Sequence, residues 1–423
     1  MTSPKPSILF VHDSYPGQFG ALAQYLHDQG WRVAFATLDD NLPKNAPYQM
    51  FGYTPHRAPS AQTHPYAQSY DRAVLQGQAC ARRCAEARNA GDLSADIIIS
   101  HVGPGAGLFL REVFPTALIV AYCEWWYQSP GIDTLYLMAL DGHTANVSLD
   151  DLILARSRNA SISAELLSAD LGLCPTHFQA DQFPIELRQK ISVLHDGVDT
   201  DYYAPLAQKD RLGQAEHPAL AQIPKNAQLV TYATRGMEPH RGFPQVFKAF
   251  WEISKEWDNV YFVLAGENTV FYGSDQDRRV DWLERCKAAY PIAPDRLIFT
   301  GTLNKYDYRW LLRRSCVHVY CTVPFVLSWS LLEAMSVGTR LVVSDVEPIR
   351  EVMPDDGAIF ADLLIKDGLK NALSLALSDQ EATTQAAKAT RARVATHYRL
   401  ADFLDKRRCW LLHALDAKKN SGT

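Results

Sequence analysis

The stretch Tyr232-Ala-Thr-Arg-Gly-Met-Glu-Pro-His-Arg-Gly242 follows an apolar, strand-like run over residues 228–233 and closes in a glycine-containing turn. The stretch Phe325-Val-Leu-Ser-Trp-Ser-Leu-Leu-Glu-Ala-Met335 follows a second apolar run, residues 317–323, and enters a helical pattern. A strand that passes through a polar loop into a helix is the unit of a parallel α/β sheet. The two stretches therefore predict polar groups at the carboxyl ends of two strands, where ligands of such sheets bind.

Charged residues in these stretches predict a site for a small, doubly negative ligand. Arg235 and Arg241 share one turn, and each guanidinium is always charged and offers forked donors, as a diphosphate requires. Glu333 can accept hydrogen bonds from two vicinal hydroxyls, as on a ribose. The predicted helix N-terminus adds unpaired N–H groups and a positive dipole end, at Ser328, Trp329 and Ser330. Singly, each feature is more often structural than functional, but together they indicate a nucleotide-sugar site.

Apolar β-rich runs alternate with helical patterns in both halves of the chain, which predicts two parallel α/β sheets. The strands expected in the first half are residues 8–11, 33–37, 96–100, 117–122, 171–174 and 191–194. Those expected in the second half are residues 228–233, 261–265, 297–300, 317–320 and 341–343. Residues 39–68, rich in Pro, Gln and His, are predicted to be an irregular insertion, and residues 204–226 are the best linker candidate.

Three groups follow strands of the first half and are predicted to face the carboxyl end of its sheet. Gly17 follows the first strand, where it allows close approach of a ligand to the backbone or simply forms the turn. His101 follows residues 96–100 and precedes Gly103-Pro-Gly-Ala-Gly107; its alternative is a buried structural histidine. Glu124 opens Glu124-Trp-Trp-Tyr127, whose rings can stack on a sugar or cover the core, and is a candidate acceptor base.

This set of motifs resembles the retaining glycosyltransferases of family 4, which have the two-domain GT-B fold. The resemblance covers most of the chain and includes the two stretches above together with Ile8-Leu-Phe-Val-His-Asp-Ser-Tyr-Pro-Gly-Gln-Phe19, His195-Asp-Gly-Val-Asp-Thr200, Gly338-Thr-Arg-Leu-Val-Val-Ser-Asp345 and Pro348-Ile-Arg-Glu351. It implies that Arg235 and Arg241 hold the donor diphosphate. It implies that Glu333, as the second Glu of an E-x7-E motif, meets the ribose and that His101 contacts the donor sugar. By the same resemblance, Asp196 and Asp199 have a hinge or capping role.

The chain departs from the family pattern at the first position of that motif. Phe325 stands eight residues before Glu333, where the family has its first Glu, and Val326-Leu-Ser-Trp329 replaces the usual glycines. Arg241 stands where Lys is usual, with one extra residue separating it from Arg235. An aromatic ring cannot accept the hydroxyl hydrogen bonds that a carboxylate accepts. These departures therefore affect the donor-sugar contacts more than the diphosphate and ribose contacts.

The implied architecture is α/β, with two doubly wound, Rossmann-like lobes of the GT-B type facing one cleft. Residues 1–205 form the acceptor-side lobe and residues 206–395 the nucleotide-sugar lobe. The last segment, residues 396–423, has a helical pattern over 397–415 and is expected to cross back onto the first lobe. A chain of 423 residues is long enough for two domains with separate cores.

Composition is that of a globular enzyme, with 47% hydrophobic and 21% charged residues. The net charge of −5 argues against nucleic acid as a partner, because phosphate binding needs a positive footprint. No apolar run is long enough for a membrane span or a signal-peptide core, so a cytoplasmic location is expected, with peripheral contact at the inner membrane face as an option. The eight cysteines form no C-x-x-C pair, which indicates free thiols and no structural zinc.

Neither of the two D-x-D patterns predicts a metal site. They fall at Asp199/Asp201 and Asp275/Asp277, away from the carboxyl ends of predicted strands, and so short a pattern arises by chance in a chain of this length. No obligatory metal or cofactor is expected. Arg235, Arg241 and the helix N-terminus can stabilise the leaving diphosphate instead of a metal ion.

The resemblance implies transfer of a hexose-type sugar, with retention, from a UDP- or GDP-linked donor to a glycan, lipid-linked or other hydroxyl acceptor in bacterial polysaccharide or glycoconjugate assembly. A front-face displacement, in which the leaving phosphate helps to deprotonate the acceptor, fits better than a covalent intermediate because no carboxylate pair stands out. Two alternatives remain: a nucleotide-sugar 2-epimerase of GT-B fold, and a non-catalytic nucleotide-binding scaffold, which Phe325 suggests.

Overall fold

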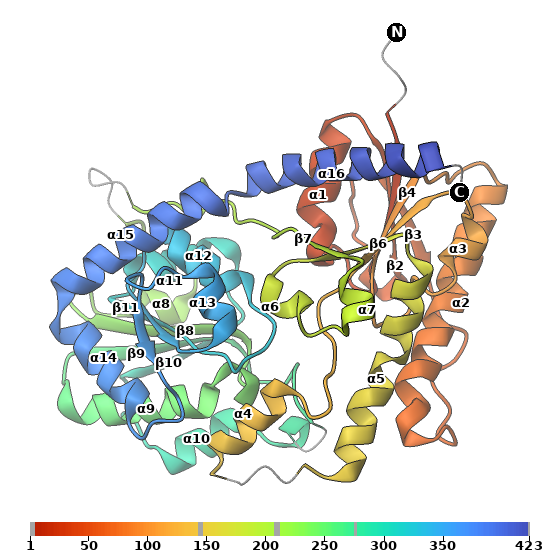
Figure 1. Cartoon of the computed structure of the whole chain (residues 1–423). Helices are drawn as coiled ribbons and strands as arrows, with labels where there is room; N and C mark the ends of the chain where they lie inside the picture. The colour runs from red at the N-terminus through yellow and green to blue at the C-terminus, as the bar shows by residue number, and fades with distance from the viewer. Residues whose placement is uncertain (1–4, 143–146, 207–211, 275–276, 422–423) are drawn as a thin grey trace. The chain divides into compact units, whose positions relative to one another are not determined.

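The computed structural model describes residues 5–142, 147–206, 212–274 and 277–421 of the chain. The chain forms two compact units (Figure 1). The first unit comprises residues 1–131, 147–197 and 401–423, and the second comprises residues 132–146 and 198–400. Each unit is built on one parallel sheet, as the alternation of strand and helix patterns predicts.

The first unit contains a seven-stranded sheet in which all neighbouring strands are parallel. Its strands span Ser7–Val11 (β1), Arg32–Leu38 (β2), Gln49–Tyr53 (β3), Ile97–His101 (β4), Leu118–Tyr122 (β5), Leu171–Cys174 (β6) and Ile191–Val193 (β7). The spatial order is β3-β2-β1-β4-β5-β6-β7. The direction of winding therefore changes between β1 and β4, and ligands of such sheets bind at the carboxyl ends beside this point.

Strand β1 shows how the sequence forms this sheet. All its residues are buried, with Ile8 and Phe10 in the core on one face and Leu9 and Val11 in the core on the other. Because successive side chains point to opposite faces, a continuous apolar run is typical of a strand covered on both sides. The covering helices are α1 (Gly20–Asp28) and α16 (Leu400–Ser421) on the first face, and α2 (Gln68–Asn89) and α5 (Leu149–Ser168) on the second. Three short helices complete the unit: α3 (Leu110–Val113), α6 (His177–Ala180) and α7 (Ile185–Arg188).

Residues 39–68, predicted to be an irregular insertion, contain the edge strand β3. Its alternate residues Phe51 and Tyr53 are buried in the core, and the strand pairs with β2 in parallel register. The prediction was wrong because a short edge strand that includes Gly52 gives only a weak alternation signal. The strand widens the sheet by one position on the side away from β4.

The second unit contains a six-stranded parallel sheet. Its strands span Gln228–Gly236 (β8), Val260–Glu267 (β9), Leu297–Gly301 (β10), Val317–Tyr320 (β11), Leu341–Ser344 (β12) and Ile359–Ala361 (β13). The order is β10-β9-β8-β11-β12-β13, so the winding changes direction between β8 and β11. The two motif stretches, residues 232–242 and 325–335, lie at the carboxyl ends of these neighbouring strands and therefore meet at the switch point of the sheet.

The helices of the second unit carry the apolar stripes that the sequence indicates. In α9 (Phe243–Glu256) the fully buried residues recur at intervals of three and four, namely Phe243, Val246, Phe247, Phe250 and Ile253. Further α-helices described between residues 198 and 399 are α8 (Pro218–Ala221), α10 (Trp282–Ala289), α11 (Lys305–Arg314), α12 (Trp329–Val337), α13 (Glu347–Val352), α14 (Gly368–Ser378) and α15 (Gln380–His397).

The two units do not follow the predicted division at residues 205 and 395. Residues 132–146 belong to the second unit, although they precede α5 of the first unit in the chain. Helix α4 (Ile132–Leu140) lies in this segment, and its residues Tyr136 and Leu140 pack against the core of the second unit. No local pattern of residues indicates this assignment, because the contacts are made with residues far along the chain. Part of the predicted linker, residues 207–211, lies outside the described residues.

Helix α16 packs on the first unit through apolar residues and one buried ion pair. Leu411 and Leu415 are buried in the core that contains Ile8 and Phe10 of β1. Arg407, 3% exposed, pairs with the carboxylate of Asp196, 8% exposed. Asp196, predicted to act at a hinge or a cap, thus anchors the last helix of the chain.

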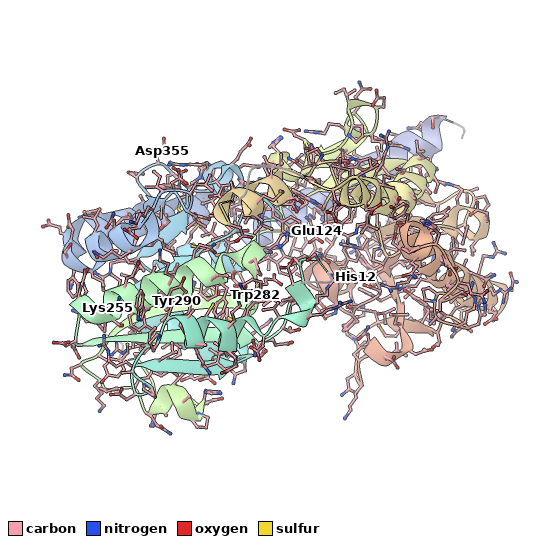
Figure 2. The ribbon with its side chains drawn as sticks, turned by 90° about the horizontal axis from the view of Figure 1, so that it is seen from below. His12, Glu124, Lys255, Trp282, Tyr290 and Asp355 are labelled. Carbon is pink, nitrogen blue, oxygen red and sulfur yellow. The ribbon has the colours of Figure 1, made fainter. Side chains whose placement is uncertain are left out.

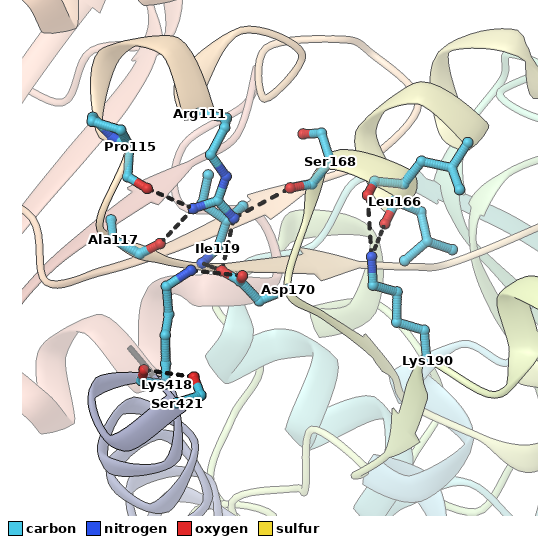
Figure 3. A network of polar contacts seen from close by, with 11 residues as sticks. Arg111, Pro115, Ala117, Ile119, Leu166, Ser168, Asp170, Lys190, Lys418 and Ser421 are labelled. Carbon is cyan, nitrogen blue, oxygen red and sulfur yellow. Dashed lines mark hydrogen bonds and ion pairs between the residues drawn. The ribbon is translucent and has the colours of Figure 1, made fainter. Parts of the chain in front are cut away.

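A second polar network holds the C-terminal turn of α16 (Figure 3). The carboxylate of Asp170 accepts hydrogen bonds from Lys418 at 2.7 Å, and from Arg111 and the backbone N–H of Ile119 at 2.8 Å each. Burial alone raises the pKa of this carboxyl, but the three donors outweigh it and lower the pKa below its ordinary value. The group is therefore a stable anion, and it links α16 to strand β5 through the backbone of Ile119.

Replacing Arg407 by an apolar residue of similar length tests the anchoring of α16. We expect Arg407→Met to lower the free energy of unfolding of the first unit by about 3–5 kcal/mol, because Asp196 is left as an unpaired buried charge. Hydrogen exchange of the β1 amides measures this quantity. The control is Arg408→Met, which removes the neighbouring arginine from its exposed pair with Asp405 and should change stability far less. Equal effects of the two substitutions would contradict the assignment.

Candidate functional site

The first unit brings four polar side chains together at the carboxyl ends of β1, β4 and β5. His12 follows β1, His101 ends β4 and Glu124 follows β5; Figure 2 labels His12 and Glu124. Nε2 of His12 lies 2.9 Å from Oε1 of Gln18, whose amide nitrogen donates to Glu124 at 3.1 Å. The second carboxylate oxygen of Glu124 lies 3.5 Å from Nε2 of His101. The structure thus joins the two predicted residues, His101 and Glu124, to His12 and Gln18, which the sequence analysis missed.

Gly17 shapes this cluster by its closeness to His12. Its φ is +48°, and a Cβ at this position would lie 2.5 Å from Cδ2 of the imidazole. A side chain is therefore disfavoured by the backbone conformation and also excluded by the ring. The backbone N–H of Ser14 donates to Nδ1 of His12, and Oδ1 of Asp13 lies 3.0 Å from the same ring nitrogen. His12 directly follows a predicted strand, which is the same signal that identified His101.

His101 and Glu124 stabilise each other as charged groups. Burial lowers the pKa of His101, but the carboxylate of Glu124 outweighs it, and the pKa lies above its ordinary value. Burial raises the pKa of Glu124, but His101 and Gln18 outweigh it, and the pKa is lowered. A carboxylate with a lowered pKa is a weak base. Glu124 is therefore better suited to orienting His101 than to removing a proton from a hydroxyl group.

The glycine-rich loop after β4 closes on a buried carboxyl group. Glu165 of α5 is 3% exposed and accepts hydrogen bonds from the backbone N–H of Gly103 at 2.9 Å and of Gly107 at 3.2 Å. Burial raises its pKa to about 7, although these N–H groups and His101 act in the opposite direction. The N–H groups that such a loop can offer to an anion are thus used by a side chain of the protein itself.

In the second unit, the two predicted arginines lie in different environments. Arg235 belongs to the end of β8, after a register shift between Ala233 and Gly236, and not to a turn as predicted. Its side chain is exposed, and its guanidinium carbon lies 3.8 Å from the centroid of the Phe271 ring. A guanidinium stacked in this way directs its N–H groups outward in its own plane, where a phosphate oxygen can accept them.

Arg241 is 6% exposed and connects the loops that follow β8 and β11. Its guanidinium donates to the carbonyl oxygen of Val326 at 2.9 Å and to the hydroxyl of Thr322 at 3.2 Å. The rings of Tyr272 and Phe325 lie 5.4 Å and 5.9 Å from its guanidinium carbon. The structure therefore brings the two motif stretches together through this side chain.

Glu238, which the sequence analysis did not single out, organises the surroundings of both arginines. It is fully buried, and one carboxylate oxygen accepts from the backbone N–H groups of Phe271 at 2.6 Å and Tyr272 at 2.9 Å. Burial raises its pKa above the ordinary value, and the two N–H groups and Arg241 only partly offset this. Glu238 thus fixes the loop whose rings contact Arg235 and Arg241. The signal that could have identified Glu238 is its position in the sequence midway between Arg235 and Arg241.

Helix α12 begins where the sequence predicts a helix N-terminus. Ser328 is its N-cap, and the Ser328 hydroxyl accepts from the backbone N–H of Ser330 at 3.4 Å. The backbone N–H of Ser328 donates to the hydroxyl of Tyr320 at 3.0 Å. Trp329 is 42% exposed. Part of the hydrogen-bonding capacity of this terminus is therefore already used within the chain.

Glu333, on the same helix, meets two tyrosine hydroxyls. The side chains of Tyr203 and Tyr308 hydrogen-bond to its carboxyl group. Burial raises the pKa of Glu333 to about 6, although the two hydroxyls and Lys305 act against this rise. The carboxyl group is therefore set among hydroxyl partners, and its predicted contact with a ribose remains a prediction.

Phe325 is a buried part of the second-unit site. It is 5% exposed, and its ring centroid lies 5.4 Å from that of His240 and 5.0 Å from that of Tyr272. Both contacts are edge-to-face, the arrangement that aromatic rings prefer. The position at which the family motif has a carboxylate is thus occupied by a packed ring beside Arg241.

Among the described residues, no group of three or more His, Cys, Asp or Glu side chains is placed to hold a metal ion. Asp199 accepts hydrogen bonds from the backbone N–H groups of Asp201 and Tyr202 in a turn, and its hinge or capping role stays a prediction. Asp275 of the second D-x-D pattern lies outside the described residues. No helix in the described part of the chain is long and apolar enough to cross a membrane.

Both units match glycosyltransferase family models. Residues 29–203 match the family described as "Glycosyl transferase family 4 group", and residues 214–393 match "Glycosyl transferases group 1". The chain belongs to the glycosyltransferases of GT-B fold. A stretch of 157 residues is 27% identical to YqgM of Bacillus subtilis, described as an uncharacterized glycosyltransferase. That stretch covers 37% of this chain and 41% of YqgM.

Solved structures of similar fold extend over nearly the whole chain of this glycosyltransferase. Sucrose-phosphate synthase from Thermosynechococcus elongatus has a TM-score of 0.72 at 16% identity, covering 98% of this chain and 100% of that one. HepE from Anabaena, in complex with UDP and glucose, has a TM-score of 0.67 at 15% identity, covering 96% and 100%. A UDP-forming trehalose-phosphate synthase from Burkholderia xenovorans has a TM-score of 0.69 at 15% identity, covering 97% and 99%. These likenesses confirm the predicted fold.

The raised pKa of Glu165 predicts a pH-dependent stability of the first unit. A carboxyl group whose pKa is higher in the folded protein stabilises the fold below its unfolded pKa, and this contribution is lost as pH rises through about 7. We expect the free energy of unfolding to fall by on the order of 3 kcal/mol from this group between pH 4.5 and pH 8. Hydrogen exchange of β4 amides across this range measures the loss.

Two variants identify the group responsible. Glu165→Gln cannot ionise and should reduce the pH dependence, even though the amide lowers stability at every pH. Glu86→Gln, which replaces an exposed carboxyl on α2, should leave the pH dependence of the wild type unchanged. If Glu165→Gln retains the full slope, the pKa assignment is wrong.

Proposed function

We propose that this glycosyltransferase moves a hexose-type sugar, with retention, from a UDP- or GDP-linked donor to a glycan, lipid-linked or other hydroxyl acceptor. The family of the chain supports transfer of a sugar. HepE, a protein of similar fold, is in complex with UDP and glucose in its structure, which supports a nucleotide-sugar donor here. The proposed setting is bacterial polysaccharide or glycoconjugate assembly in the cytoplasm, with peripheral contact at the inner membrane face.

The observation that carries the proposal is the pair of arginines at the switch point of the second sheet. Arg235 presents a stacked, exposed guanidinium, and Arg241 lies in the adjoining loop, where one nitrogen of its guanidinium donates to Val326 and Thr322. Two fixed positive charges beside a helix N-terminus match the charge of a diphosphate. Glu333 lies one turn into that helix, and its carboxyl group already accepts from hydroxyls of the protein, which is the chemistry required to bind a ribose.

The proposed chemistry follows from where charge develops. As the bond to the sugar breaks, negative charge collects on the departing diphosphate, and Arg235, Arg241 and the start of α12 stabilise it. The sugar becomes oxocarbenium-like, and the acceptor oxygen attacks from the same face. The proton of the acceptor passes to the departing phosphate. No obligatory metal or cofactor takes part in this scheme.

In the first unit, His101 is the proposed contact for the donor sugar. The Glu124 carboxylate, 3.5 Å from Nε2, favours the protonated ring, which donates from both nitrogens. Gly17 belongs to the same cluster through His12. Since the lowered pKa of Glu124 makes it a weak base, the proposal assigns it to orientation of His101 and replaces its predicted role as acceptor base.

A panel of nucleotide sugars tests the proposal directly. We expect release of UDP or GDP and a glycosylated product when the protein is incubated with UDP- and GDP-hexoses and a mixture of glycan and lipid-linked acceptors. The anomeric configuration of the product, read by NMR, should equal that of the donor. Conversion of a donor to its 2-epimer without acceptor would support the epimerase alternative. Binding without any conversion would support the scaffold alternative.

Arg235 offers a clean test of the diphosphate site because its side chain is exposed, whereas removal of Arg241 would also break contacts that hold the loop after β11. We expect Arg235→Ala to weaken binding of UDP or GDP by roughly 1.5–3 kcal/mol, the value of a charged hydrogen bond. Calorimetry measures the affinity. The matched control is Arg285→Ala, which removes an exposed arginine stacked on Trp282 and should leave the affinity unchanged. Unchanged affinity in Arg235→Ala would rule out this diphosphate contact.

A further inference from the structure

Helix α4 brings a carboxylate to the site of the second unit. Its residues Asp133, Tyr136 and Leu140 are spaced by three and four, so they share one face of the helix. Tyr136 and Leu140 pack against the core of the second unit. Asp133 continues this face, and its Oδ2 atom lies 3.5 Å from Nε2 of His240. The segment therefore holds Asp133 in a defined position next to the loop after β8.

His240 connects this carboxylate to the proposed diphosphate site. It immediately precedes Arg241 in the 3₁₀ turn Pro239–Arg241, and its ring packs edge-to-face on Phe325 at 5.4 Å between centroids. The side chains of Asp133 and His240 are 14% and 11% exposed, so both are largely removed from water. Asp133 thus contacts the imidazole that directly precedes Arg241, a proposed diphosphate contact, and this imidazole packs on the ring of Phe325.

The hydrogen-bonding capacity of this pair is not used up within the described part of the chain. Nδ1 of His240 is buried and has no hydrogen-bond partner among the described residues. A carboxylate offers about four acceptor positions, and a hydroxyl group can both donate and accept hydrogen bonds. A buried polar atom without a partner is costly. A hydroxyl group of a ligand would give Nδ1 of His240 a partner and could also donate to Asp133.

Charge decides which part of a nucleotide sugar can lie here. A phosphate would be repelled by Asp133, because like charges at short distance in a desolvated site disfavour each other. An uncharged part of the ligand that carries hydroxyl groups is attracted instead. In a nucleotide sugar, the group attached directly to the diphosphate and rich in hydroxyls is the sugar. The aromatic edge of Phe325 adds an apolar surface of the kind that packs against sugar C–H groups.

We propose that Asp133 and His240 form the donor-sugar subsite of the second unit, in which Asp133 accepts hydrogen bonds from sugar hydroxyls and His240 holds its carboxylate in place. Asp133 is then a specificity-determining residue, supplied by a helix that lies outside the motif stretches in the sequence. This inference rests on the proposed function, since it names the part of the donor that the same site recognises.

Calorimetry with paired ligands tests the subsite: UDP against UDP-glucose, and GDP against GDP-mannose. We expect Asp133→Asn to weaken binding of the nucleotide sugar by about tenfold, while binding of the matching nucleoside diphosphate changes by less than about twofold. His240→Gln keeps an amide N–H to face Asp133, so it should retain most of the preference for the nucleotide sugar over the nucleoside diphosphate. His240→Ala should lose this preference. The control Asp141→Asn, an exposed acidic residue just beyond the end of α4, should behave as the wild type.

The alternative to be excluded is that the pair only fastens α4 to the second unit. In that case Asp133→Asn lowers the affinity for the nucleoside diphosphate and for the nucleotide sugar equally, or changes neither affinity. It also raises the rate of hydrogen exchange along α4. Either of the two binding results overturns the subsite. A wild-type protein that binds neither UDP nor GDP refutes the proposed function, and this inference with it. If the wild-type protein binds both members of a pair and Asp133→Asn changes neither affinity, the subsite is refuted but the proposed function is not.

Discussion

The buried guanidinium of Arg241 is the contact on which the site of the second unit depends. Its hydrogen bonds to Val326 and Thr322 hold the loop after β11 against the loop after β8, and rings from two loops enclose it. A buried cation is tolerated only where it is hydrogen-bonded, because its desolvation is otherwise expensive. The same requirement that keeps the charge satisfied therefore fixes the distance between the two motif stretches and the start of α12.

Buried carboxyl groups serve the loops of both units in the same way. Glu165 binds backbone N–H groups of the glycine-rich loop after β4, and Glu238 binds those of Phe271 and Tyr272. In each loop, the buried carboxyl group accepts hydrogen bonds from backbone N–H groups that would otherwise have no partner.

Much of the fold could be predicted because its strands are covered on both faces. The continuous apolar runs of β1, β8 and β11 mark buried parallel strands, and polar residues directly after them mark the carboxyl ends of the sheets. The edge strand β3 and the short β13 were missed, since edges bury less and carry weaker patterns. Within the site, the same rule predicts His101 and Glu124; His12 also follows a strand directly, but it was not predicted.

The sequence by itself determined the two α/β lobes and the residues that follow their strands, because these depend on local periodicity and on turn chemistry. Only the tertiary structure decided which of those residues are buried, which loops a carboxyl group holds, and that α4 belongs to the second unit. These properties arise from contacts between residues distant in the chain. Arg235 and Arg241 look alike in the sequence, but one is exposed on a ring and the other is enclosed. The difference lies in what the fold packs around each side chain.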